Sequence, residues 1–129
     1  IVRNGQKITA TIANARMMVD VAKESGSFGR FLQQWPDEDQ AGLLAWLHKN
    51  GSRLGGATGQ YFLRFCGYDA WIASPDVCAA LIREGVLDTP RATSKTALKK
   101  VDSAMTDLHQ QSHLPRAVIS RVLALSVGP

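Results

Sequence analysis

A glycine-rich stretch near the middle of the chain, RLGGATGQYFLRFCGYD at residues 53–69, is well suited to bind an anion. Gly55, Gly56 and Gly59 stand directly before a short apolar and aromatic run that predicts a helix. A glycine turn before a helix can expose consecutive backbone N–H groups, which bind a phosphate together with the helix dipole. Arg53 and Arg64 flank the turn and add positive charge. The same pattern is typical of a plain connection between two helices, and both interpretations stay open.

Asp76 is the carboxylate that we consider for catalysis. It follows Ser74 and Pro75, a combination that predicts the start of a helix. An acid in the first turn also interacts favourably with the helix dipole, so a structural role competes with a catalytic one. A catalytic role would require a pocket beside this carboxylate.

The remaining side chains that could take part in catalysis or bind a metal do not form a recognised motif. His109 and His113 are four residues apart, but no glutamate lies between them and no cysteine pair completes a zinc site, so we expect them to cover a helix. No lysine of the Walker type and no strand accompany the glycine turn, which excludes nucleoside triphosphate and dinucleotide motifs. No G-x-S-x-G sequence is present. We therefore expect neither a metal nor a cofactor.

Helices must position these residues, because apolar side chains recur at helical spacing throughout and no segment alternates as a strand does. Ile8, Ile12, Ala15, Val19 and Ala22 predict the buried face of a first helix. Further helices are expected near residues 27–35, 37–50, 58–66, 74–85, 94–108 and 115–128. The predicted fold is a single all-α domain over residues 1–129, a compact bundle of about six or seven short helices.

The composition is that of a globular protein, with 45% hydrophobic and 20% charged residues among 129. A net charge of +4 is compatible with a polyanionic partner. Cys66 and Cys78 lie in apolar helical surroundings and predict buried free thiols in a reducing cytosol. No apolar run reaches the length of a membrane span, and no signal peptide is visible, so we expect a cytoplasmic protein. Since the chain begins with Ile1, we expect the start of the protein to lie upstream.

Three segments in this order resemble the 3-methyladenine DNA glycosylase I family, within the helix-hairpin-helix DNA glycosylase superfamily. They are IVRNGQKITATIANAR, the glycine turn with YFLRFCG, and SPDV, and the similarity extends from residue 1 to about residue 88. The closing ISRVLALSVG is similar to the last helix of broader members. The resemblance implies a helix-hairpin-helix element and a bacterial base-excision repair enzyme, a monomer associated with the nucleoid, that flips a damaged base from double-stranded DNA and hydrolyses its N-glycosidic bond.

Carried onto this sequence, the resemblance implies DNA binding by the backbone and side chains of the turn and by the loop before the next helix. These residues are Arg53, Gly55, Gly56, Ala57, Thr58, Gly59 and Ser74. The family's glutamate and aromatic residues for base binding come largely from an N-terminal segment that would precede Ile1. The aspartate of other superfamily members aligns with Ser74, two residues before Asp76, so the catalytic residue is not assigned. The zinc ligands of some members correspond to Asp76 and Ala80, and we predict no zinc.

Three functions remain open at this point. The leading hypothesis is a DNA N-glycosylase for alkylated bases such as 3-methyladenine. The second is a helix-hairpin-helix module that binds duplex DNA without catalysis. The third is a helical interaction domain with no nucleic-acid role.

Overall fold

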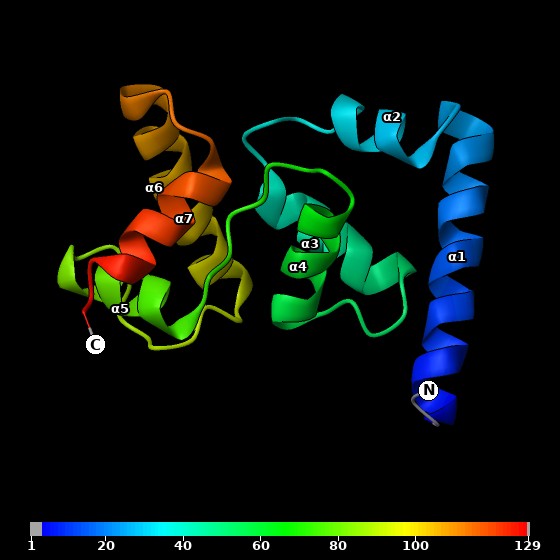
Figure 1. Ribbon diagram of the computed structural model, residues 1–129, viewed down its shortest axis with the longest axis horizontal. Coiled ribbons are helices and arrows are strands. Elements are labelled where there is room, and N and C mark those ends of the chain that lie inside the picture. The colour runs from blue at the N-terminus through cyan, green and yellow to red at the C-terminus, as the bar shows by residue number, and fades with distance from the viewer. Residues whose placement is uncertain (1–3, 129) are drawn as a thin grey trace.

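The computed structural model describes residues 4–128, and this part of the chain forms seven helices and no strand (Figure 1). The helices are α1 (Gly5–Ser25), α2 (Phe28–Gln34), α3 (Gln40–Asn50), α4 (Gly56–Phe65), α5 (Pro75–Arg83), α6 (Lys95–Ser112) and α7 (Arg116–Leu125). The predicted all-α bundle of six or seven helices is therefore confirmed. Within the described range, no helix is both long and apolar enough to cross a membrane.

Short polar side chains begin most of these helices. Ser27, Ser74 and Ser94 each accept a hydrogen bond from a backbone N–H in the following turn, as the sequence predicts. Asn4 and Asp39 cap α1 and α3 in the same way. These caps fix where each helix starts, and so they also fix the lengths of the connections between helices.

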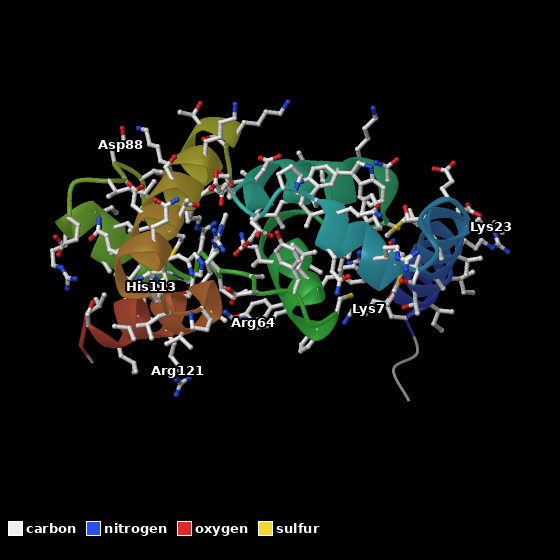
Figure 2. The ribbon with its side chains drawn as sticks, turned by 90° about the horizontal axis from the view of Figure 1, so that it is seen from above. Lys7, Lys23, Arg64, Asp88, His113 and Arg121 are labelled. Carbon is white, nitrogen blue, oxygen red and sulfur yellow. The ribbon has the colours of Figure 1, made fainter. Side chains whose placement is uncertain are left out.

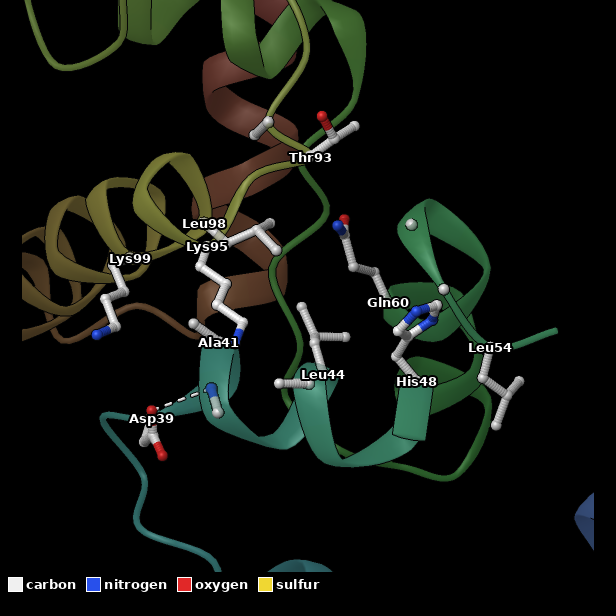
Figure 3. Close-up of a pocket in the computed structure, with 15 residues that line it drawn as sticks. Asp39, Ala41, Leu44, His48, Leu54, Gln60, Thr93, Lys95, Leu98 and Lys99 are labelled. Atoms are coloured by element: carbon white, nitrogen blue, oxygen red, sulfur yellow. Dashed lines mark hydrogen bonds between the residues drawn. The ribbon is translucent and has the colours of Figure 1, made fainter. Parts of the chain in front are cut away.

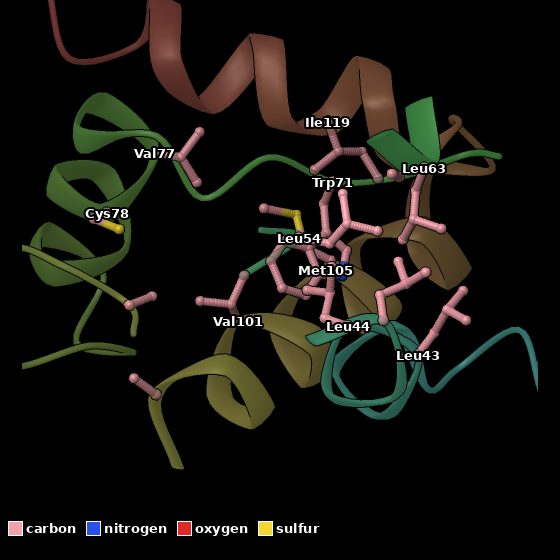
Figure 4. Packing of buried hydrophobic residues seen from close by; sticks show 14 of the residues in the cluster. Leu43, Leu44, Leu54, Leu63, Trp71, Val77, Cys78, Val101, Met105 and Ile119 are labelled. Atoms are coloured by element: carbon pink, nitrogen blue, oxygen red, sulfur yellow. The ribbon is translucent and has the colours of Figure 1, made fainter. Parts of the chain in front are cut away.

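The core lies between α3, α4, α6 and the segment that joins α4 to α5 (Figure 4). Trp71, in that connecting segment, is completely buried. Apolar side chains from the surrounding helices pack in the same cluster, among them Leu43, Leu47, Leu63, Val101 and Met105. Burial of a large aromatic ring in a connection means that this connection is part of the core and is not a surface loop.

The connecting segment is extended, so side chains must satisfy its backbone hydrogen-bonding groups. The Gln40 amide bonds to both the N–H and the C=O of Trp71, each at 3.0 Å. Two further side chains accept from the segment: Ser120 Oγ from Ile72 N–H at 3.0 Å, and Gln60 Oε1 from Ala73 N–H at 2.7 Å. Helices α3, α4 and α7 thus hold one segment in place.

Asp102 of α6 is a buried acid that completes this arrangement. Its carboxylate accepts from Trp71 Nε1–H at 3.0 Å and from the Ala41 N–H at 2.9 Å, at the start of α3. Burial raises the pKa of Asp102, although both hydrogen bonds favour the ionised form and oppose the rise. The side chain therefore ties α6 to α3 and to the connecting segment.

The predicted buried face of α1 is wrong, although the helix itself is confirmed. Ile8, Ile12 and Val19 are about half exposed, whereas Ala10 and Met17 are buried. The reason is that α1 packs mainly against α2, at one end of the molecule in Figure 1, and presents its Met17 side to the core. Nothing in residues 4–128 covers the other side of the helix.

Candidate functional site

The glycine-rich turn joins α3 to α4 and forms an exposed hairpin of two helices. Its Arg53 is exposed and adopts a left-handed backbone conformation with φ 59°, which is uncommon for a residue other than glycine. Gly55 occupies the N-cap position of α4, and Gly56, at φ 60°, is its first residue. Gly56 is exposed, as are Ala57 and Thr58 after it. The structure thus brings most of the predicted DNA-binding residues to one exposed helix start.

The N-terminus of α4 differs from those of the other helices because no side chain among residues 4–128 caps it. The start of α7 also lacks a capping residue of its own, but Asp69 accepts from the N–H groups of Arg116 and Ala117, both at 2.9 Å. The N–H groups of residues 56–58 have no such acceptor within the described chain. Free, aligned N–H groups at the positive end of a helix dipole favour an anion.

The three glycines of the turn have different structural roles. A Cβ at Gly55 would lie 2.7 Å from Nδ1 of His48, which packs directly over it, so this position is closed by a side chain. A Cβ at Gly59 would overlap the carbonyl oxygen of Leu54, so this position is closed by backbone. Gly56 has open space around it and needs glycine for its positive φ. Gly59 is buried, so its contribution to any DNA binding is to let α4 approach the turn.

Ser74 and Asp76 lie at the start of α5. Ser74 is half-buried, and its hydroxyl accepts from the Val77 N–H at 3.2 Å. Asp76 is exposed, and it does not line the cavity that Ser74 borders. In Figure 1 the N-terminal ends of α4, α5 and α6 lie at the same lower edge of the molecule, so their positive dipole ends share one side.

Arg64 does not serve the turn. It lies in the last turn of α4, at the end opposite the glycines, and its Nη2 donates to the Ala70 carbonyl at 2.9 Å. Figure 2 shows it on the same side of the molecule as Arg121, and these two side chains line one cavity with Ser74. The prediction that Arg64 adds positive charge at the glycine turn is therefore wrong.

The histidines and cysteines have ordinary environments. His109 Nδ1 lies 2.7 Å from the Leu114 carbonyl oxygen, and His113 ends α6 in a left-handed conformation. Within residues 4–128, no three His, Cys, Asp or Glu side chains are grouped to hold a metal ion. Cys78 is buried and Cys66 half-buried, and both are free thiols, as predicted, although Cys66 is less enclosed than expected. Burial raises the pKa of the Cys66 thiol.

Sequence reasoning missed His48 and Gln60, the two polar side chains next to the turn. His48 lies in the last turn of α3 and Gln60 in the second turn of α4, so each is within one helical turn of the hairpin. That proximity was the available signal, but it does not show which way a side chain points.

Comparison with known proteins gives one match. Residues 1–46 match the sequence model of the methyladenine glycosylase family. The matched range includes IVRNGQKITATIANAR and ends before the glycine turn. The resemblance to the 3-methyladenine DNA glycosylase family is therefore confirmed over these residues. No curated protein sequence and no solved structure matches the chain.

Proposed function

We propose that this chain is part of a DNA N-glycosylase that excises alkylated bases such as 3-methyladenine during base excision repair. The observation that carries the proposal is the match of residues 1–46 to the methyladenine glycosylase family. The uncapped, exposed start of α4 supports it, because a repair enzyme needs a grip on DNA that does not depend on sequence.

The α3–α4 hairpin is the proposed helix-hairpin-helix element. In this proposal the N–H groups of Gly56, Ala57 and Thr58 bind a backbone phosphate of duplex DNA. The positively charged Arg53 lies in the turn before them and strengthens binding at low salt. The start of α5, which Ser74 caps, lies on the same side of the molecule and extends the contact along the backbone.

The chemistry consists of base flipping followed by hydrolysis of the N-glycosidic bond. Flipping costs a few kcal/mol, and least for a damaged base that stacks weakly. An adenine methylated at N3 carries positive charge and is therefore a good leaving group. Asp76 is exposed and away from the neighbouring cavity, which makes it a poor general base. We therefore propose that this chain holds the DNA and that the catalytic group comes from elsewhere in the protein.

The test is release of free 3-methyladenine from methylated duplex DNA by a protein that contains this chain, followed by chromatography. The proposal predicts release by the parent protein and by its Asp76→Asn variant alike. Absence of release, under conditions in which a control glycosylase is active, would contradict the proposal.

The exposure of Asp76 also favours a second candidate function, a helix-hairpin-helix module that binds duplex DNA without cutting it. This function predicts binding that weakens steeply with salt and shows little sequence preference, with no base release. Measurement of duplex affinity and of base release on the same preparation separates the two functions.

A further inference from the structure

A pocket beside the hairpin contains polar groups that the DNA-holding function does not use. It lies between α3, the start of α4 and the start of α6, and its volume is about 500 Å³ (Figure 3). Leu44 and Leu98 give it an apolar floor. The size is within the range of roughly 300–1,000 Å³ that is typical of small-molecule sites.

Gln60 places an unused hydrogen-bond donor in this pocket. The residue is only 2% exposed, and its Oε1 is committed to the Ala73 N–H. This bond orients the amide, and Nε2 donates no hydrogen bond to another group within residues 4–128. In Figure 3 the side chain extends toward the centre of the pocket. Gln40, the other buried glutamine, uses both ends of its amide, whereas the Nε2 of Gln60 is reached by solvent and is open to a ligand.

Two lysines line the pocket on the side of α6. Lys95 and Lys99 are one helical turn apart and exposed. Within the described chain, no carboxylate lies within 4 Å of either ammonium group, although Asp39 also lines the pocket. The Asp39 carboxylate accepts from the Gly42 N–H at 3.0 Å and so caps α3. Both ammonium groups are therefore available to an anionic ligand.

The opposite wall is formed by His48 and the start of α4. The imidazole packs over Gly55 and supplies a planar face, and Gly56 lines the same wall. A ligand that fits all three walls has an apolar ring, an acceptor on that ring and a group with strong negative charge.

We propose that this pocket binds a nucleotide. Its ring lies on Leu44 and Leu98 and accepts a hydrogen bond from Gln60 Nε2, and its phosphate binds Lys95 and Lys99. A nucleobase provides ring acceptors, and a terminal phosphate has a charge of about −1.5 to −2 at neutral pH, which suits two ammonium groups. The proposal does not rest on glycosylase activity. The nucleotide comes either from free solution or from a DNA strand that passes the adjacent hairpin.

The experiment is an NMR titration of the chain with deoxyadenosine 5′-monophosphate, and separately with a short single-stranded oligonucleotide. Both arms follow the Gln60 side-chain amide and the methyl groups of Leu44 and Leu98. We expect these signals to shift with the free mononucleotide if it is the ligand, or with the oligonucleotide alone if the nucleotide must belong to a strand. Unchanged Gln60 and leucine signals in both arms, up to about 10 mM mononucleotide, would overturn the proposal.

Matched variants test the two polar contacts. Lys95→Gln or Lys99→Gln should weaken binding by about fivefold each, whereas Lys100→Gln, exposed on the same helix but outside this pocket, should have no effect. Gln60→Glu keeps an acceptor for Ala73 and removes the donor, and we expect it to abolish binding. Equal losses in all three lysine variants, or shifts reproduced by inorganic phosphate alone, would show general anion attraction and would contradict a nucleotide site. The lysine variants decide the question even if Gln60→Glu does not fold.

Discussion

Replacement of Gly59 by alanine tests the packing of the hairpin. The added Cβ would overlap the Leu54 carbonyl oxygen and come within 3.4 Å of Leu44 Cδ2. Because the first obstacle is backbone, the turn must move away from α4. Overpacking of this kind costs about 1–3 kcal/mol, against which the better helix propensity of alanine returns about 1 kcal/mol at most. We expect a net loss of about 1–2 kcal/mol, which is roughly a 5- to 30-fold change in the folding equilibrium constant.

The assay is urea unfolding of the variant beside two other glycine-to-alanine replacements. Gly29→Ala is the control, because its Cβ would meet only Ser27 Oγ at 3.9 Å, and we expect stability within about 1 kcal/mol of the parent. Gly56→Ala has room but a positive φ, and should cost about 1 kcal/mol. A Gly59→Ala chain as stable as the Gly29→Ala chain would refute the described approach of α4 to the turn.

Further outcomes are expected for Asp102, for the two cysteines and for Arg53. Asp102→Asn should lower the free energy of unfolding by about 1–3 kcal/mol. The reason is that the amide has one acceptor oxygen, whereas the carboxylate accepts from both the Ala41 N–H and the Trp71 Nε1–H. The free energy of unfolding should also depend on pH differently in the parent and in the variant. Burial raises the pKa of Asp102, so the folded state binds its proton more tightly, and the acid's contribution to stability falls as pH rises from about 3.8 to the raised pKa. Iodoacetamide should alkylate Cys66 more slowly than free cysteine, since its pKa is raised, and Cys78 more slowly still because it is buried; faster labelling of Cys78, seen by mass spectrometry, would contradict its described burial. Arg53→Gly should raise stability by up to about 1 kcal/mol by relieving a left-handed conformation, while weakening duplex binding; a loss of stability in urea unfolding would contradict the described turn.

The helices and their starting residues can be predicted from the sequence, through helical spacing and capping residues. Ser27, Ser74 and Ser94 begin helices because a short hydroxyl side chain satisfies N–H groups that the helix leaves free, and this effect is local. The face that a helix buries is not local. The apolar residues Ile8 and Ile12 predict a buried side of α1, but its packing against α2 buries Met17 instead.

In the candidate site, too, local features can be predicted from the sequence and features that depend on tertiary packing cannot. The glycine pattern predicts a turn and an exposed helix start, because these depend on backbone conformation. The pattern cannot distinguish Gly59, where a Cβ would overlap the Leu54 carbonyl oxygen, from Gly56, where a Cβ would meet no other atom. Trp71 bonds to Gln40 and to Asp102, each 31 positions away, and Asp102 also bonds to Ala41, 61 positions away. No short sequence motif can reveal a network of such distant residues. Tertiary packing decides which polar side chains are committed to structure and which remain available to a ligand.

The central claim is that the start of α4 holds DNA by its backbone, and amide chemical shifts during titration with a short duplex test it most directly. The account predicts that the N–H signals of Gly56, Ala57 and Thr58 move most, and that the shifts diminish as salt is raised. Gly56→Ala should weaken the binding while the chain stays folded. Duplex binding that leaves these three amides unchanged, or no duplex binding at low salt, would contradict the account.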